Sequence, residues 1–120
     1  MTIRGTRNLF GEEANKLVSA IDALRDICVM FGYQEFIPSI LSVQQPFIDK
    51  AGKEIVNQLY AFDDKMGRPI CLIPEVTAVF KNLYKIEWEK TLPKPVNLFY
   101  ATRCYRYERP QLGRPARLHR

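Results

Sequence analysis

The sequence predicts an α+β fold in which an antiparallel sheet carries flanking helices. Three observations predict it: a helical apolar pattern over residues 12–31, a hairpin pattern around Asp63–Gly67, and a long strand pattern at residues 97–108. A chain of 120 residues makes one domain at most, so we treat residues 1–120 as a single domain.

The first helix begins at Glu12 and Glu13, whose carboxylates suit the positive end of the helix dipole. Gly32 is expected to end it, because glycine readily takes the left-handed conformation that follows many helices. Apolar residues recur at three- and four-residue spacing, which predicts a face packed on the core. They are Ala14, Leu17, Val18, Ile21, Leu24, Ile27, Cys28 and Phe31.

The next segments are short. Residues 33–37 are aromatic or β-branched at alternate places, which predicts a strand, and Pro38 stops it because proline cannot donate to a sheet. Residues 44–50 form a short helical turn, which Gly52 is expected to close.

Two strands follow, at residues 59–62 and 69–73, joined by the turn Asp63–Gly67. Residues 77–86 carry apolar side chains at helical spacing, and residues 88–95, with two prolines, are expected to be a loop.

The strand at residues 97–108 runs into a basic loop. Six arginines lie in this part of the chain, opposed only by Glu108, and the rest of the sequence holds 12 basic and 12 acidic residues. Guanidinium groups can each hold two oxygens of a phosphate or carboxylate, so this stretch predicts binding of an anion. Because the last strand has an unpaired edge, we expect a returning strand beyond Arg120. The arginines are Arg103, Arg106, Arg109, Arg114, Arg117 and Arg120.

Two pairs of residues could bind a ligand. Alternation along a strand places Arg106 and Glu108 on one face, where they could hold a phosphate and a hydrogen-bond donor. A surface ion pair is the alternative. Glu75 and Thr77 lie where a strand ends and a helix begins, so they could receive a ligand ammonium group. Alternatively, Thr77 caps the helix and Glu75 stabilises its N-terminus.

The remaining composition excludes several classes of protein. The three cysteines are widely separated and His119 is the sole histidine, so no metal-ligand spacing exists and no metal ligands are assigned. Free cysteines fit a reducing cytoplasm. No apolar run is long enough to span a membrane. The basic loop alone would also permit nonspecific nucleic-acid binding.

Residues 105–111 read Tyr-Arg-Tyr-Glu-Arg-Pro-Gln and are followed by Gly113-Arg114 and His119. This stretch resembles the second signature motif of class II aminoacyl-tRNA synthetases, in the form used by histidyl-tRNA synthetases. Four further segments are similar to that family in the same order: Arg4–Leu9, the first motif at Phe31–Pro38, the hairpin Leu59–Asp64, and Pro74–Ala78. The first motif would cover about residues 14–40 and the second about 97–120.

The resemblance implies a class II synthetase-like core, incomplete at its C-terminus, that activates histidine with ATP and transfers it to tRNA(His). Arg106 would be catalytic and would hold the ATP α-phosphate and the histidine carboxylate, with Glu108 near adenine and Arg114 near the outer phosphates. Glu75 and Thr77 would receive the histidine ammonium group. Val76 and Arg120 would complete the histidine site.

The resemblance also implies Mg²⁺, whose ligands cannot be assigned, and a cytoplasmic homodimer formed through helix 12–31 and the Pro38 region. Four positions depart from the family pattern, which usually has aspartate at Asn8, arginine at Ile73, glycine at Val76 and glutamine at Arg120. Since the chain stops inside the second motif, we expect residues 1–120 alone to be inactive. The rival interpretations are a noncatalytic relative, such as the regulatory subunit of ATP phosphoribosyltransferase, and a truncated dimerisation or RNA-binding module.

Overall fold

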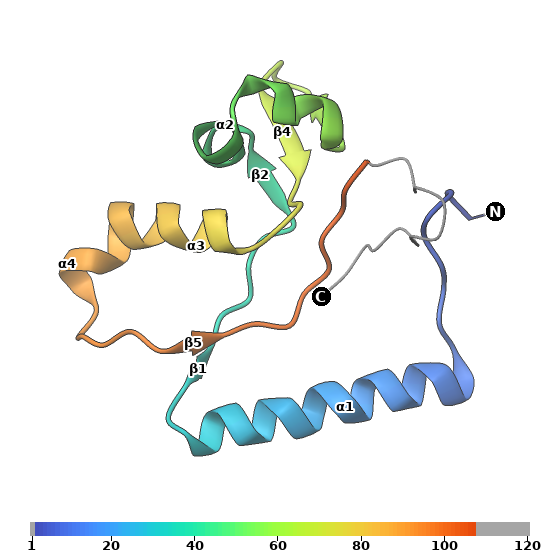
Figure 1. Cartoon of the computed structure of the whole chain (residues 1–120), viewed down its shortest axis with the longest axis vertical. Coiled ribbons are helices and arrows are strands. Elements are labelled where there is room, and N and C mark those ends of the chain that lie inside the picture. The colour runs from blue at the N-terminus through green and yellow to red at the C-terminus, as the bar shows by residue number, and fades with distance from the viewer. Residues whose placement is uncertain (1, 108–120) are drawn as a thin grey trace. The chain divides into compact units, whose positions relative to one another are not determined.

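The computed structural model describes residues 2–107, and the chain divides into two compact units (Figure 1). One unit combines the described N-terminal residues through Ile37 with Pro93–Ala101, and the other contains Pro38–Leu92 and the described residues from Thr102 to Tyr107. Every candidate site residue that the structure describes lies in the second unit.

The first unit is dominated by α1 (Gly11–Met30), which confirms the predicted helix. Gly32 follows it with φ of +83°, donates its N–H to the Val29 carbonyl, and is followed by Tyr33, which donates to the Cys28 carbonyl. These two bonds form a Schellman motif, which satisfies carbonyls that the helix end would otherwise leave unpaired. The predicted role of Gly32 is therefore confirmed.

Of the eight apolar residues that were predicted to face the core from this helix, half are partly buried. Four are half-buried, at positions that fall on one side of the helix, whereas the other four are exposed and α1 has no fully buried residue. Because a short strand pair covers less of a helix than a broad sheet would, much of the apolar surface of α1 faces solvent. The half-buried members are Ala14, Leu17, Ile21 and Cys28, and the exposed ones are Val18, Leu24, Ile27 and Phe31.

That strand pair consists of β1 (Gln34–Glu35) and β5 (Leu98–Phe99), which are parallel. The long strand predicted at residues 97–108 is therefore wrong in its extent. Beyond Phe99 the chain leaves β1 and passes into the second unit, where its backbone bonds to other segments. The parallel pairing was not expected, because it joins segments that are far apart in the sequence.

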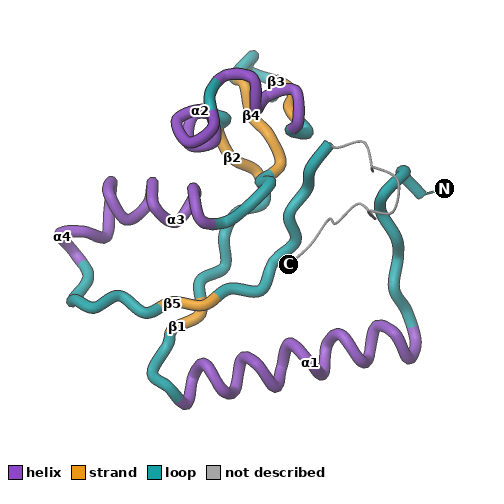
Figure 2. Tube along the Cα trace, viewed as in Figure 1, coloured by secondary structure: helices purple, strands orange, loops and turns teal. Residues whose placement is uncertain are grey.

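The second unit contains a three-stranded antiparallel sheet in the order β2-β4-β3, comprising β2 (Leu41–Val43), β3 (Ala61–Asp63) and β4 (Pro69–Leu72) (Figure 2). The β3–β4 hairpin confirms the predicted one. Gly67 in its turn has φ of +77°, and the Asp64 carboxylate accepts hydrogen bonds from the backbone N–H groups of Met66 and Arg68. Sequence analysis did not predict β2.

Helices connect and flank this sheet. The predicted turn before Gly52 is α2 (Gln45–Ala51), and the 3-10 helix η1 (Lys53–Gln58) follows it. After β4 come α3 (Thr77–Leu83), the π-helical turn η2 (Tyr84–Trp88) and α4 (Glu89–Thr91).

The loop predicted to begin at Trp88 therefore begins only after Thr91. The Trp88 ring packs against the Phe80 ring with centroids 5.8 Å apart, a contact that favours the continued helix. No helix in the described range is long and apolar enough to cross a membrane.

The core of the second unit joins residues from its sheet, from its helices and from the segment after β5. Ile73 and Cys71 are fully buried, and Cys104 is 4% exposed, so the C-terminal segment is part of this core. The buried apolar residues are Phe47, Leu59, Cys71, Ile73, Val76, Ala78 and Cys104.

Candidate functional site

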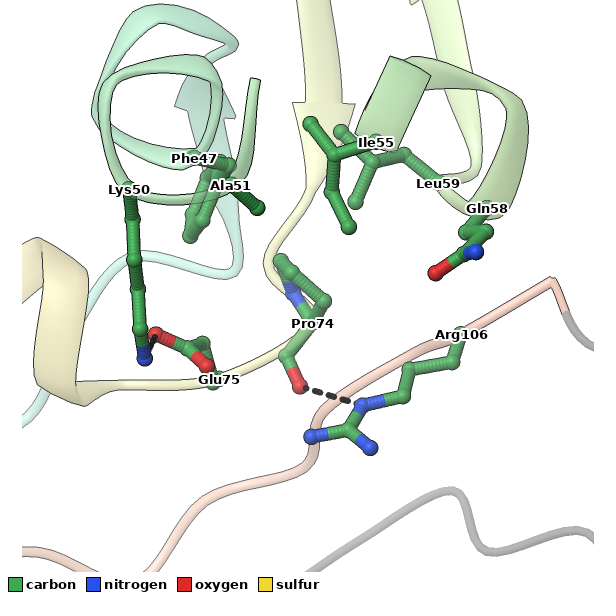
Figure 3. Close-up of a pocket in the computed structure, with 9 residues that line it drawn as sticks. All are labelled: Phe47, Lys50, Ala51, Ile55, Gln58, Leu59, Pro74, Glu75 and Arg106. Carbon is green, nitrogen blue, oxygen red and sulfur yellow. Dashed lines mark hydrogen bonds and ion pairs between the residues drawn. The ribbon is translucent and has the colours of Figure 1, made fainter. Parts of the chain in front are cut away.

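A pocket of about 180 Å³ lies within the second unit (Figure 3). Its walls come from α2, from η1 and the residue after it, from the junction between β4 and α3, and from the C-terminal segment. The lining mixes apolar side chains with three charged ones, as expected of a site that binds a small polar ligand. The lining residues are Phe47, Lys50, Ala51, Ile55, Gln58, Leu59, Pro74, Glu75 and Arg106.

Arg106 is positioned by the backbone on both sides of it. The N–H of Tyr105 donates to the Ile73 carbonyl at the end of β4, and the N–H of Tyr107 donates to the Gln58 carbonyl at the end of η1, both at 2.9 Å. The chain here is extended, so side chains alternate between two sides. Cys104 is buried and Arg106 half-buried, whereas Arg103 is exposed. Tyr105 is half-buried as well, so burial does not alternate strictly along this segment, and the predicted pairing of Arg106 with Glu108 on one face stays a prediction because Glu108 lies outside the described residues.

The Arg106 side chain lies across the chain that leaves β4. Its Nε donates to the Pro74 carbonyl at 3.3 Å, and its guanidinium group lies below that carbonyl in the pocket (Figure 3). A planar guanidinium group held in this way presents several N–H donors in a fixed orientation, an arrangement suited to a carboxylate or a phosphate.

Glu75 lines the same pocket beside Pro74. Its Oε1 accepts from the ammonium group of Lys50 at 2.6 Å, and the side chains of Lys50 and Glu75 are 49% and 24% exposed. Sequence analysis missed Lys50. A lysine in the last turn of a helix is commonly found there because it suits the negative end of the helix dipole. This explanation accounts for Lys50 in the sequence without suggesting that it also pairs with Glu75 across the pocket.

The other predicted site residues are placed differently. Val76 is 2% exposed and occupies the N-cap position of α3, without a side-chain cap bond. The alternative in which Thr77 caps the helix is therefore wrong, since Thr77 is the first helical residue and is exposed. Neither side chain lines the pocket. The predictions for Glu108, Arg114, His119 and Arg120 lie outside the described residues.

The described residues form no metal cluster, and one of the three cysteines has a perturbed pKa. Residues 2–107 contain no group of three or more histidine, cysteine or acidic side chains that could hold a metal ion. All three cysteines are free, and burial raises the pKa of the Cys71 thiol. A buried thiol of raised pKa stays protonated at neutral pH, so Cys71 acts as a small apolar core residue.

The pocket therefore contains two binding groups of opposite charge. Glu75 supplies a carboxylate that can accept an ammonium group, and Arg106 supplies a guanidinium group that can hold an anion. A ligand carrying both charges, such as an amino acid, would match this pair.

Comparison with solved structures identifies the class of fold. The chain superimposes on apo histidyl-tRNA synthetase of S. aureus with a TM-score of 0.76 and 25% identity, over 89% of this chain and 29% of that one. It also superimposes on a Bacillus halodurans protein described as an ATP phosphoribosyltransferase regulatory subunit/histidyl-tRNA synthetase, with a TM-score of 0.77 and 20% identity, over 97% and 29% of the two chains. The fold is that of part of a class II aminoacyl-tRNA synthetase core, as predicted.

Within that class, the sequence matches the N-terminal part of histidine–tRNA ligases. The enzyme of Methanocorpusculum labreanum is 40% identical over 111 residues, which is 92% of this chain and 27% of the relative. The resemblance inferred from the motifs is therefore confirmed, and the chain spans about a quarter of the length of the curated relatives that it matches. No family model matches the chain.

Proposed function

We propose that this chain carries part of a histidine–tRNA ligase-like active site, one that activates histidine with ATP and serves its transfer to tRNA(His). The observation that carries the proposal is that Glu75 and Arg106 line one pocket, although they come from different segments of the chain. The match to curated histidine–tRNA ligases supports the choice of substrate.

In the proposed reaction, an oxygen of the histidine carboxylate attacks the α-phosphorus of ATP, histidyl-adenylate forms and pyrophosphate leaves. Negative charge builds on the α-phosphate during this step. Arg106 would hold that phosphate and the attacking carboxylate, and a preorganised cation at the reacting centre stabilises such a transition state. Glu75 would fix the other end of histidine by accepting its ammonium group.

The remaining roles are proposed from the motif alone. Glu108 would contact the adenine end and Arg114 the outer phosphates. Val76, Thr77 and Arg120 would complete the surroundings of histidine. The Val76 side chain is buried, so it could contribute only apolar packing, whereas Thr77 is exposed at the start of α3 and its hydroxyl oxygen could accept from the ammonium group together with Glu75.

Mg²⁺ commonly accompanies ATP, where it neutralises phosphate charge. Glu75 is the carboxylate that lines the pocket, and its Oε1 is paired with Lys50. These residues do not form a magnesium-binding set, so no step of the proposed reaction is assigned to a metal held by this part of the chain.

Histidine-dependent exchange of pyrophosphate into ATP tests the proposal. We expect no exchange with residues 1–120 alone, and exchange when the chain is extended past Arg120 with the rest of a synthetase core. Activity in neither form would rule out the synthetase function. If the inactive extended form still bound histidine, the noncatalytic, regulatory-subunit-like function would be favoured instead.

We also propose a cytoplasmic homodimer that uses α1 and the Pro38 region. Free cysteines suit a reducing compartment. The dimer would cover apolar side chains of α1 that are exposed on either flank of its half-buried stripe, among them Val18, which is 56% exposed, and Leu24, which is 62% exposed. Leu24→Glu should convert the dimer to a monomer in light scattering, whereas Lys16→Glu, on the same helix, should not. A wild-type monomer at high concentration would contradict this assembly for the chain.

A further inference from the structure

The ion pair between Lys50 and Glu75 places an ammonium group inside the candidate site. Lys50 reaches across from the last turn of α2, and its Nζ lies 2.6 Å from Glu75 Oε1 (Figure 3). Both side chains line the pocket that also contains Arg106. The proposed reaction gives Lys50 no role.

The Lys50 ammonium group and the α-ammonium group of an amino acid are chemically alike. Each is a compact cation with three N–H donors and no acceptor. Two ammonium groups held by one carboxylate repel each other, and this repulsion disfavours the charged form of each. A ligand ammonium group and Lys50 therefore compete for Glu75.

We propose that Lys50 occupies the ammonium position of this site when no ligand is bound, and that an α-amino acid binds by displacing Lys50 from Glu75. This inference rests on the proposed role of Glu75 as the acceptor of the ligand ammonium group. The Lys50 side chain is 49% exposed and has a flexible stem, so its ammonium group can move into water while the stem stays on the pocket wall.

Displacement makes Lys50 a determinant of ligand choice. Every ligand that brings an ammonium group must replace Lys50, whereas a ligand without one leaves the ion pair in place. Removing the Lys50 charge should therefore strengthen binding of ammonium-bearing ligands selectively. A lysine that merely held Glu75 in position would have the opposite effect, because its loss would weaken binding.

The test compares Lys50→Met with wild type by calorimetric titration. Methionine keeps an unbranched stem and a helix propensity similar to that of lysine. Lys53→Met is the matched control, because it removes the same charge from an exposed position that does not line the pocket. The ligands are histidine, histamine, which has no carboxylate, and imidazole-4-propionate, which has no ammonium group.

We expect Lys50→Met to bind histidine and histamine about two- to fivefold more tightly, a modest gain because partly exposed ion pairs are weak. Imidazole-4-propionate should gain nothing, and Lys53→Met should resemble wild type. If wild type binds histidine but Lys50→Met binds it equally or more weakly, the displacement is wrong and the proposed function stands. If another α-amino acid binds instead and is tightened by Lys50→Met, displacement stands and histidine is the wrong substrate. If neither wild type nor Lys50→Met binds any α-amino acid, the displacement of Lys50 and the proposed function are both wrong.

A second measurement observes Lys50 directly. In wild type with ¹⁵N-labelled lysine, the Lys50 ammonium resonance should be shifted by its bond to Glu75 and should move toward that of exposed lysines as histidine is added. A Lys50 resonance that stays unchanged at saturating histidine would refute displacement.

Discussion

Replacing Arg106 with methionine removes the guanidinium group of the candidate site and keeps an unbranched stem. A hydrogen bond to a charged group contributes about 1.5–3 kcal/mol, so loss of the proposed phosphate contact should weaken ATP binding roughly 10- to 100-fold. The bond to the Pro74 carbonyl is long, at 3.3 Å, so its loss should lower the free energy of unfolding by about 1.5 kcal/mol, the lower end of that range. The segment should stay in place, because its main chain is held through Tyr105 and Tyr107.

Calorimetric titration with ATP and urea unfolding separate these two effects. Arg106→Lys should bind ATP with intermediate affinity, because lysine keeps the charge but lacks the planar fork. Arg103→Met is the control, since it removes an exposed arginine from the same segment. Unchanged ATP affinity in Arg106→Met would refute the reasoning. Equal losses in Arg106→Met and Arg103→Met would show that general positive charge, rather than the pocket, binds ATP.

Three further predictions concern stability, each measured by urea unfolding. The backbone N–H of Arg68 lowers the pKa of Asp64, so its contribution is present above the ordinary pKa of about 4 and lost as the pH falls through the lowered value. The stability advantage of wild type over Asp64→Asn should therefore be larger at pH 7 than at pH 2, and equal advantages would contradict it. Gly32→Ala should cost about 1 kcal/mol, since alanine is strained at φ of +83°; a neutral result would exclude that conformation. Ile73→Ala should cost about 2–5 kcal/mol, because Ile73 is fully buried, and a cost below about 1 kcal/mol would show that it is not a core residue.

Local patterns predicted the parts of the fold that depend on neighbouring residues. The helix from Gly11 to Met30, its end at Gly32 and the hairpin turn at Gly67 each follow from spacing or from glycine within a few residues. The parallel pairing of β1 with β5 and the short strand β2 depend instead on partners far along the chain. The three residues of β2 give too short a pattern to be recognised on their own, whereas the equally short β3 was recognised through the turn that follows it.

In the candidate site, too, sequence patterns predicted some of the pocket residues and not others. Glu75 and Arg106 stood out because motifs surround them, and both line the pocket. Lys50 could not be found, because its partner lies on another segment. The structure also explains two departures from the family pattern. Ile73 is fully buried among core residues, where an arginine charge would be costly, and Val76 has φ of −100°, which does not require glycine.

The two backbone bonds on either side of Arg106 have a consequence for natural variation and for engineering. They use the N–H groups of positions 105 and 107, not their side chains. Most replacements at Tyr105 should therefore leave the direction of the Arg106 side chain unchanged, and at Tyr107 the same should hold for side chains that keep the edge-on contact with the Tyr60 ring, whose centroid lies 5.6 Å away. Proline is different, because it has no N–H to donate. In a library randomised at these two positions, variants that keep ligand binding should be diverse in side chain and depleted of proline.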